Sequence, residues 1–165
     1  MSELLVKEKT ENIVKKLSLN ENLVNNRYFA EALCVENYEN KSHNNRKLAN
    51  VGDRFLKLVL AEEGYQICQT VEDINKFTND NENDWYLAQL GLVKATDGYC
   101  MVTNDVPLEN FKHDNGGKRS IKMIATLIEA IIGALYLEEF EHTGKSDTTR
   151  AFIKNKIIAK PLKYL

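Results

Sequence analysis

Apolar residues recur every three or four positions through most of the chain, which is the spacing of helices that bury one face. The pattern predicts an all-α fold. The expected helices span residues 3–17, 22–36, 45–64, 70–78, 83–91, 119–140 and 147–158. Asn, Asp and Gly gather between several of these segments, as they do in loops. We expect a short strand pair at Tyr99–Val102 in the loop 94–117, and Asp147 as the N-cap of the last helix.

The helix expected at 119–140 carries one acid, Glu129, inside its most apolar stretch. Burying a carboxylate is costly unless it is paired or bound to a metal ion. A second acid, Asp53, lies among apolar neighbours on the helix 45–64, directly after Gly52, and a glycine allows close approach of another helix. Two such acids could bind a hard cation such as Mg²⁺. Each could instead pair with a lysine, an arginine or a backbone donor, and the spacing leaves both interpretations open.

The bulk composition narrows the class of protein without identifying it. A length of 165 residues predicts one domain, and a formal net charge of −2 gives no overall attraction to polyanions, so any such binding must come from local patches. The three cysteines are far apart in the sequence, which argues against a disulfide framework and favours an intracellular protein. No apolar run approaches the roughly 20 residues needed to cross a bilayer, so no membrane partner is expected.

Three segments share a recognisable combination of residues: LANVGDRFLKLVLA at 48–61, NDWYLAQLGL at 83–92 and GKRSIKMIATLIEAIIGALYLE at 117–138. In order and separation they resemble the motifs of the ribonuclease III domain family. The resemblance implies that family's all-helical endonuclease fold. It implies a single domain over residues 1–165, with a core at about 22–158 and a flanking helix at 3–17. It also implies a homodimer that lays double-stranded RNA across a pair of Mg²⁺ sites.

The family's site uses four carboxylates, two in each main motif, and only two have counterparts here. By the resemblance, Asp53 and Glu129 match the second acid of each motif and are the expected catalytic and metal-binding residues. The positions of the two partner acids are occupied by Ala49 and Thr126, neither of which is acidic. We therefore expect weak Mg²⁺ binding at most and lost or much reduced endonuclease activity, although the sequence alone leaves the enzymatic question open.

The resemblance also assigns partner surfaces. Basic residues near the two motifs are the expected RNA contacts: Arg46, Lys47, Lys118, Arg119 and Lys122. The family places a phenylalanine that plugs into the partner subunit where this chain has Asn50. The expected dimer interface consists of Asn50, Phe55, Leu56 and Val59. The sequence given ends before the double-stranded RNA-binding domain that often follows in the family, so we expect none and predict weak, salt-sensitive RNA binding.

Three functional hypotheses follow. The first is a degenerate ribonuclease III domain that binds double-stranded or structured RNA, or a protein partner, without efficient cleavage. The second is an active or weakly active Mg²⁺-dependent endonuclease of RNA processing that uses Asp53, Glu129 and a further ligand that the sequence does not identify. The third is a structural component of a ribonucleoprotein particle of the mitochondrial-ribosomal type, located in the mitochondrion instead of the cytoplasm or nucleus. Replacement of two carboxylates favours the first or the third.

Overall fold

The computed structural model describes residues 3–33, 45–95 and 117–158, and these residues contain helices and turns but no strand. The all-α prediction is confirmed. The helices are α1 (Glu3–Lys16), the 3₁₀ helix η1 (Glu21–Asn25), α2 (Arg27–Ala32), α3 (Arg46–Ile67), α4 (Val71–Glu82), α5 (Asp84–Ala95), α7 (Gly117–Thr143), α8 (Asp147–Phe152) and the π-helical turn η2 (Ile153–Ile157). The strand pair predicted at Tyr99–Val102 lies outside the described residues.

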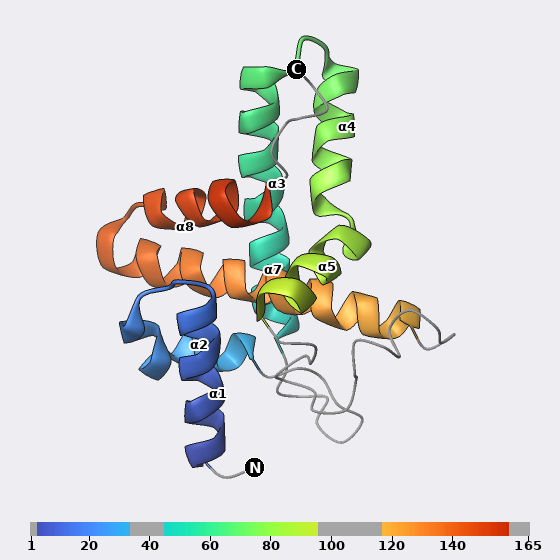
Figure 1. Cartoon of the computed structure of the whole chain (residues 1–165). Coiled ribbons are helices and arrows are strands. Elements are labelled where there is room, and N and C mark those ends of the chain that lie inside the picture. The colour runs from blue at the N-terminus through green and yellow to red at the C-terminus, as the bar shows by residue number, and fades with distance from the viewer. Residues whose placement is uncertain (1–2, 34–44, 96–116, 159–165) are drawn as a thin grey trace.

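The fold is organised around α3 and α7, which cross one another in Figure 1. Two glycines allow this crossing. A Cβ placed on Gly52 would strike the carbonyl oxygen of Glu129 and lie 2.7 Å from the backbone nitrogen of Gly133. A Cβ on Gly133 would likewise lie 3.1 Å from the nitrogen of Gly52. The two backbones are therefore in direct contact, as expected for Gly52 from the sequence.

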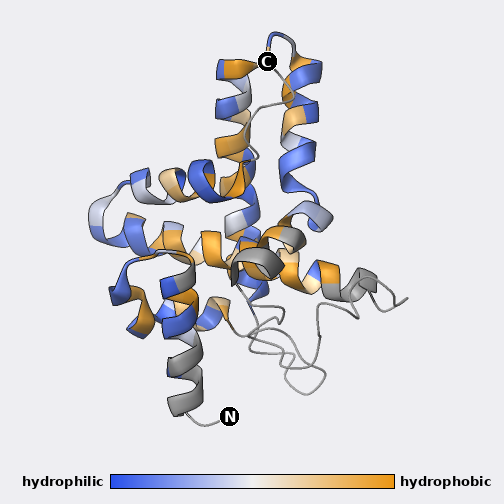
Figure 2. Ribbon diagram, viewed as in Figure 1, coloured by the Kyte–Doolittle hydropathy of each residue, from blue (hydrophilic) through white to orange (hydrophobic). Residues whose placement is uncertain are grey.

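Helix α7 is apolar on more than one side because it is packed on two sides. Its residues Ala130 and Ile131 belong to a core cluster shared with α1, α2 and the start of α3. Its residues Ile128 and Ile132 belong to a second cluster, shared with the later part of α3, α4, α5 and η2. Figure 2 shows hydrophobic residues concentrated where α3, α5 and α7 meet. No helix in the described part of the chain is long and apolar enough to cross a membrane.

Two of the predicted elements differ from the observed ones. The single helix expected at 22–36 is broken at Asn26, whose extended backbone and side chain cap α2 by accepting hydrogen bonds from the amides of Tyr28 and Phe29. The loop expected at 79–82 is instead the last turn of α4. Asn83 then separates α4 from α5, and its side chain accepts a hydrogen bond from the Tyr86 amide at 2.8 Å. Capping by short polar side chains thus decided both boundaries.

The cap predicted at Asp147 is also wrong. The capping position before α8 is Ser146, which makes no side-chain capping hydrogen bond. The carboxylate of Glu139, on α7, takes over this role and accepts hydrogen bonds of 2.8 Å from the amides of Thr148 and Thr149. A carboxylate at a helix N-terminus is also favoured by the helix dipole. The start of α8 is therefore tied to α7 by a contact between residues about ten positions apart.

Candidate acidic site

The crossing of α3 and α7 brings together the two acids that the sequence selects. Asp53 follows the glycine that touches α7, and Glu129 supplies the carbonyl oxygen on the other side of that contact. Both side chains are half-buried. Helical spacing puts Ala49 on the same side of α3 as Asp53, and Thr126 on the same side of α7 as Glu129. The site therefore has two carboxylates, with a buried methyl group and a half-buried hydroxyl beside them.

The carboxyl group of Glu129 is strongly perturbed. Burial, assisted by the negative charges of Asp53 and Asp84, raises its pKa from 4.5 to about 7. The positive charges of Lys57 and Lys122 oppose this rise but do not cancel it. Near neutral pH the group is therefore divided between its protonated and ionised forms. Such perturbation is common at functional sites.

Asp53 is engaged by a lysine from its own helix. The ammonium of Lys57 lies 2.9 Å from Oδ1 and 3.1 Å from Oδ2 of Asp53. The pKa of Lys57 is raised chiefly by this hydrogen bond, against the opposing effect of burial, with further contributions from the charges of Asp53, Glu82 and Glu129. Pairing with a lysine, which the sequence left open for both acids, is thus observed at Asp53.

Two acids that sequence reasoning missed also belong to this neighbourhood. Glu82 ends α4, and its Oε2 is buried without a hydrogen-bond partner. Burial raises its pKa; Asp53 adds to this rise, and Lys57 opposes it. Asp84, in the first turn of α5, acts on Glu129. Both flank Asn83 in a segment that reads as a loop. A prediction that extended the helix 70–78 through residue 82 would have placed Glu82 at the end of α4.

Glu72 and Asp73 are two further acids on α4 and lie in its first turn. Glu72 is exposed in the first turn of α4. Asp73 is bonded to the N-cap of the same helix, since the hydroxyl of Thr70 donates to its carboxylate at 2.7 Å and accepts from its amide at 3.1 Å. Their chemistry is therefore local to the start of α4.

The acids of this site fit Mg²⁺ poorly. In residues 3–33, 45–95 and 117–158 no three Asp, Glu, His or Cys side chains come close enough together to hold a metal ion. The acids around the crossing are Asp53, Glu82, Asp84 and Glu129, and an ammonium group already contacts both oxygens of Asp53. Mg²⁺ is held by ionised carboxylates in nearly octahedral geometry, whereas here Asp53 is paired with an ammonium and Glu129, with a pKa of about 7, is partly protonated near neutral pH. The arrangement can hold a proton on Glu129 and an ion pair at Asp53.

The predicted RNA-contacting residues are located at the starts of α3 and α7. Arg46 and Lys47 are exposed in the first turn of α3. Lys122 is exposed on α7, and its charge acts on Glu129, so it lies on the side of the acidic site. Lys118 and Arg119 fall in the first turn of α7, but their side chains lie outside what the structure describes.

Most of the predicted dimer interface is in fact core. Leu56 and Val59 are 0% exposed, and Phe55 stacks on Tyr136 with ring centroids 4.4 Å apart. These three side chains pack within one chain, which leaves Leu56 and Val59 no exposed surface and Phe55 only 7%. Their assignment to a dimer interface stays a prediction. Asn50, in contrast, is exposed, and its side-chain oxygen accepts a hydrogen bond from the Arg54 side chain at 3.2 Å.

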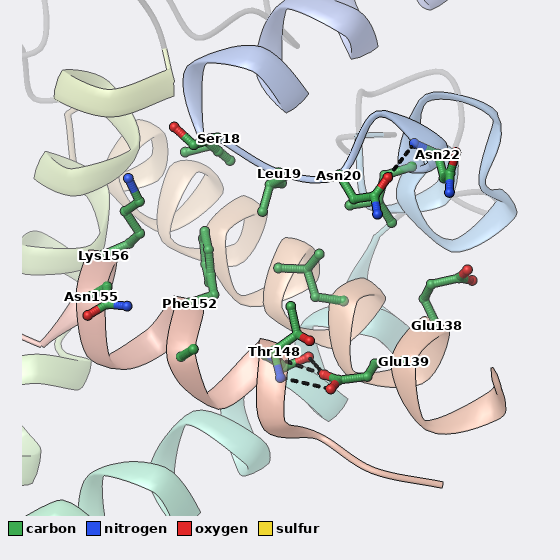
Figure 3. A pocket seen from close by; sticks show the side chains of 15 residues that line it. Ser18, Leu19, Asn20, Asn22, Glu138, Glu139, Thr148, Phe152, Asn155 and Lys156 are labelled. Atoms are coloured by element: carbon green, nitrogen blue, oxygen red, sulfur yellow. Dashed lines mark hydrogen bonds between the residues drawn. The ribbon is translucent and has the colours of Figure 1, made fainter. Parts of the chain in front are cut away.

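A pocket of about 410 Å³ lies apart from the acids, between the segment after α1, the end of α7 and α8 (Figure 3). Its two carboxylates are both engaged in hydrogen bonds within the fold. Glu139 caps α8, and Glu138 accepts a hydrogen bond from the side chain of Asn26. We therefore assign the candidate chemistry to the acids at the helix crossing and not to this pocket.

Comparison with known proteins points to one family. The pattern of the ribonuclease III domain matches residues 46–139, more than half of the chain. The chain is 31% identical over 121 residues to a protein named Ribonuclease 3 of Campylobacter jejuni subsp. doylei, covering 70% of this chain and 49% of that protein. It is 28% identical over 127 residues to Ribonuclease 3 of Aliarcobacter butzleri, covering 73% and 52%. The chain thus spans about half the length of the curated relatives it matches.

Two solved structures of the nuclease domain of ribonuclease III from Campylobacter jejuni have a similar fold. One superimposes with a TM-score of 0.59 at 28% identity and covers 88% of this chain and 94% of the other. The second structure shows flexibility in a region involved in dimer formation of that nuclease domain. It superimposes with a TM-score of 0.62 at 24% identity and covers 89% of this chain and 94% of the other. The helical fold is therefore that of the nuclease domain.

Proposed function

Because the chain belongs to the ribonuclease III domain family, we propose that it binds double-stranded or structured RNA with lost or much reduced endonuclease activity. The observation that carries the proposal is the composition of the acidic site. By the resemblance, Ala49 and Thr126 stand where the family has two of its four carboxylates. Lys57 forms a salt bridge with Asp53, one of the two acids that remain. A site with so few free oxygen donors is poorly suited to Mg²⁺-dependent hydrolysis.

RNA binding in this proposal relies on short basic segments, because the whole chain is slightly acidic. Arg46 and Lys47 are exposed at the start of α3, and Lys122 is exposed beside the acids. Each phosphate contact releases counterions, so affinity should fall steeply with salt. Replacing Arg46 and Lys47 by glutamine should weaken binding and make its salt dependence shallower.

The proposal is tested by cleavage and binding measured on the same RNA. The protein is incubated with long double-stranded RNA in millimolar Mg²⁺ or Mn²⁺, and binding is followed by fluorescence anisotropy in EDTA. We expect binding and no cleavage. Cleavage that disappears in Asp53→Asn or Glu129→Gln would establish the second hypothesis, an active endonuclease, which the names of the curated relatives favour. Failure to bind RNA would instead support a role through a protein partner.

We also propose that the domain forms a homodimer through the exposed face of α3. Asn50, Leu58 and Tyr65 fall on one side of this helix, and the last two are 48% and 75% exposed. Exposed apolar side chains on one helix face are a common feature of protein interfaces. In sedimentation velocity at low micromolar concentration, Leu58→Glu should shift the protein to monomer. Val71→Glu, an equally apolar exposed position on α4, should leave the oligomeric state unchanged.

The third hypothesis, a mitochondrial ribonucleoprotein component, receives no support from the relatives, which are bacterial. We therefore retain a location inside the cell, without a mitochondrial assignment, as part of the proposal.

A further inference from the structure

The positive charge in the acidic site of this chain has a different source from the one that the family resemblance implies. The resemblance implies a divalent ion among four carboxylates, whereas this chain keeps two of the four and adds a lysine one helical turn after Asp53. We propose that the ammonium group of Lys57 is a built-in cation that replaces the divalent ion at Asp53 and hinders its binding. The inference deepens the proposed function and rests on it for its biological meaning, but it can be tested without RNA.

The geometry supports this reading because Lys57 covers both oxygens of one carboxylate. Its Nζ lies 2.9 Å from Oδ1 and 3.1 Å from Oδ2 of Asp53, distances at which each oxygen is engaged in a charge-assisted hydrogen bond. Residues four apart on a helix are neighbours on its surface, so α3 itself presents the lysine to the acid. A metal ion that coordinates Asp53 would have to share its oxygens with this ammonium, at the cost of charge repulsion, or displace it.

Lys57 also serves acids from the other two helices around it. Its charge interacts with Glu82 at the end of α4 and with Glu129 on α7, in addition to Asp53 on its own helix. The negative charge of Asp53 disfavours ionisation of Glu82 and of Glu129. The single ammonium therefore lies within electrostatic reach of three carboxylates, which is the position that a cation takes in an acidic site.

Non-acidic residues at positions 49 and 126 and a lysine at position 57 change the charge of the site in the same direction. Fewer carboxylates lower the attraction for a doubly charged ion, and the positive charge of Lys57, with that of Lys122 at Glu129, offsets part of the repulsion among those that remain. Lys57 is about half-exposed, so its contact with Asp53 is screened by solvent and by itself adds little stability. Its effect should therefore be visible in metal affinity more clearly than in folding.

The test is a titration of the full chain with Mn²⁺ alone, in which free ion is measured by electron paramagnetic resonance at pH 7.5. We expect Lys57→Met to bind Mn²⁺ at least tenfold more tightly than the wild type, because removing a positive charge beside a divalent ion removes a repulsion. Asp53→Asn in the Lys57→Met background should abolish the gain. Lys57→Arg, which keeps the charge, should resemble the wild type.

Lys76→Met is the matched control, since it removes one exposed lysine from α4 and changes the net charge equally. It should leave Mn²⁺ affinity unchanged. Equal affinity of the wild type and Lys57→Met would overturn the proposal, as would an equal gain in Lys76→Met. A circular dichroism melt confirms folding of each variant, and Lys57→Gln provides a second neutral replacement. Since RNA binding is measured separately in EDTA, failure of the metal test and failure of the proposed RNA binding remain distinguishable.

Discussion

Replacing Glu129 by glutamine should stabilise the protein at alkaline pH and change its stability little at acidic pH. In the folded chain, burial together with the charges of Asp53 and Asp84 raises the pKa of Glu129 from 4.5 to about 7, against the opposing charges of Lys57 and Lys122. The folded state therefore holds this proton over a pH range in which the unfolded state has released it. Stability contributed by the group falls as pH rises from about 4.5 to about 7.

The size of the effect follows from the shift. At about 1.36 kcal/mol per pKa unit, a rise from 4.5 to about 7 corresponds to about 3 kcal/mol of cost for the ionised form. The side chain is only half-buried, so screening by water reduces the expected gain to about 1–2 kcal/mol. Glutamine has nearly the same shape and no charge, and it should recover this amount above pH 7.

Urea unfolding followed by circular dichroism at pH 5 and pH 8 measures the difference. Glu129→Gln should raise the free energy of unfolding at pH 8 by about 1–2 kcal/mol and by much less at pH 5. Glu31→Gln, an exposed position on α2, is the control and should show no such dependence. A gain of equal size at both pH values, or no gain at pH 8, would refute the argument that Glu129 is ionised at a cost in the folded protein.

Three further outcomes are expected in the same unfolding assay. Gly52→Ala should cost about 3 kcal/mol or more, because its Cβ meets the backbone of α7. Gly64→Ala should cost less, because its Cβ would lie 3.1 Å from Cγ2 of Ile74 and 3.3 Å from a ring carbon of Phe77, which are side-chain atoms; equal losses in the two variants would contradict the backbone contact at Gly52. Asn26→Ala should cost about 1 kcal/mol through the lost cap of α2; an unchanged midpoint would show that Asn26 does not hold that boundary. Burial acts to raise the pKa of Glu139, but hydrogen bonds from the start of α8 outweigh it and the pKa is lowered. Glu139→Gln should therefore destabilise the protein at pH 7 by about 1 kcal/mol, with less effect as pH falls below 4.5; equal loss at pH 3 and pH 7 would contradict this.

The sequence alone determined the class of fold and selected the two acids that meet at the helix crossing. The spacing of apolar residues predicted the helices, because a 3.6-residue period can be recognised in the sequence without knowing which helices are in contact. Gly52 indicated a close helix approach, and the motifs around Asp53 and Glu129 pointed to the family, whose pattern matches residues 46–139. These conclusions depend only on the identity and spacing of residues that are near one another in the sequence.

Tertiary structure decided which side of each helix is buried and which charges meet. Phe55, Leu56 and Val59 form an apolar stripe, but periodicity cannot say whether such a stripe faces the chain's own α7 or a partner. Glu82 reaches Asp53 only because α4 continues through a segment that reads as a loop. The charge balance at Asp53, Lys57 and Glu129 likewise depends on distances between separate helices, because Coulomb energies and burial are set in space and not by position in the sequence.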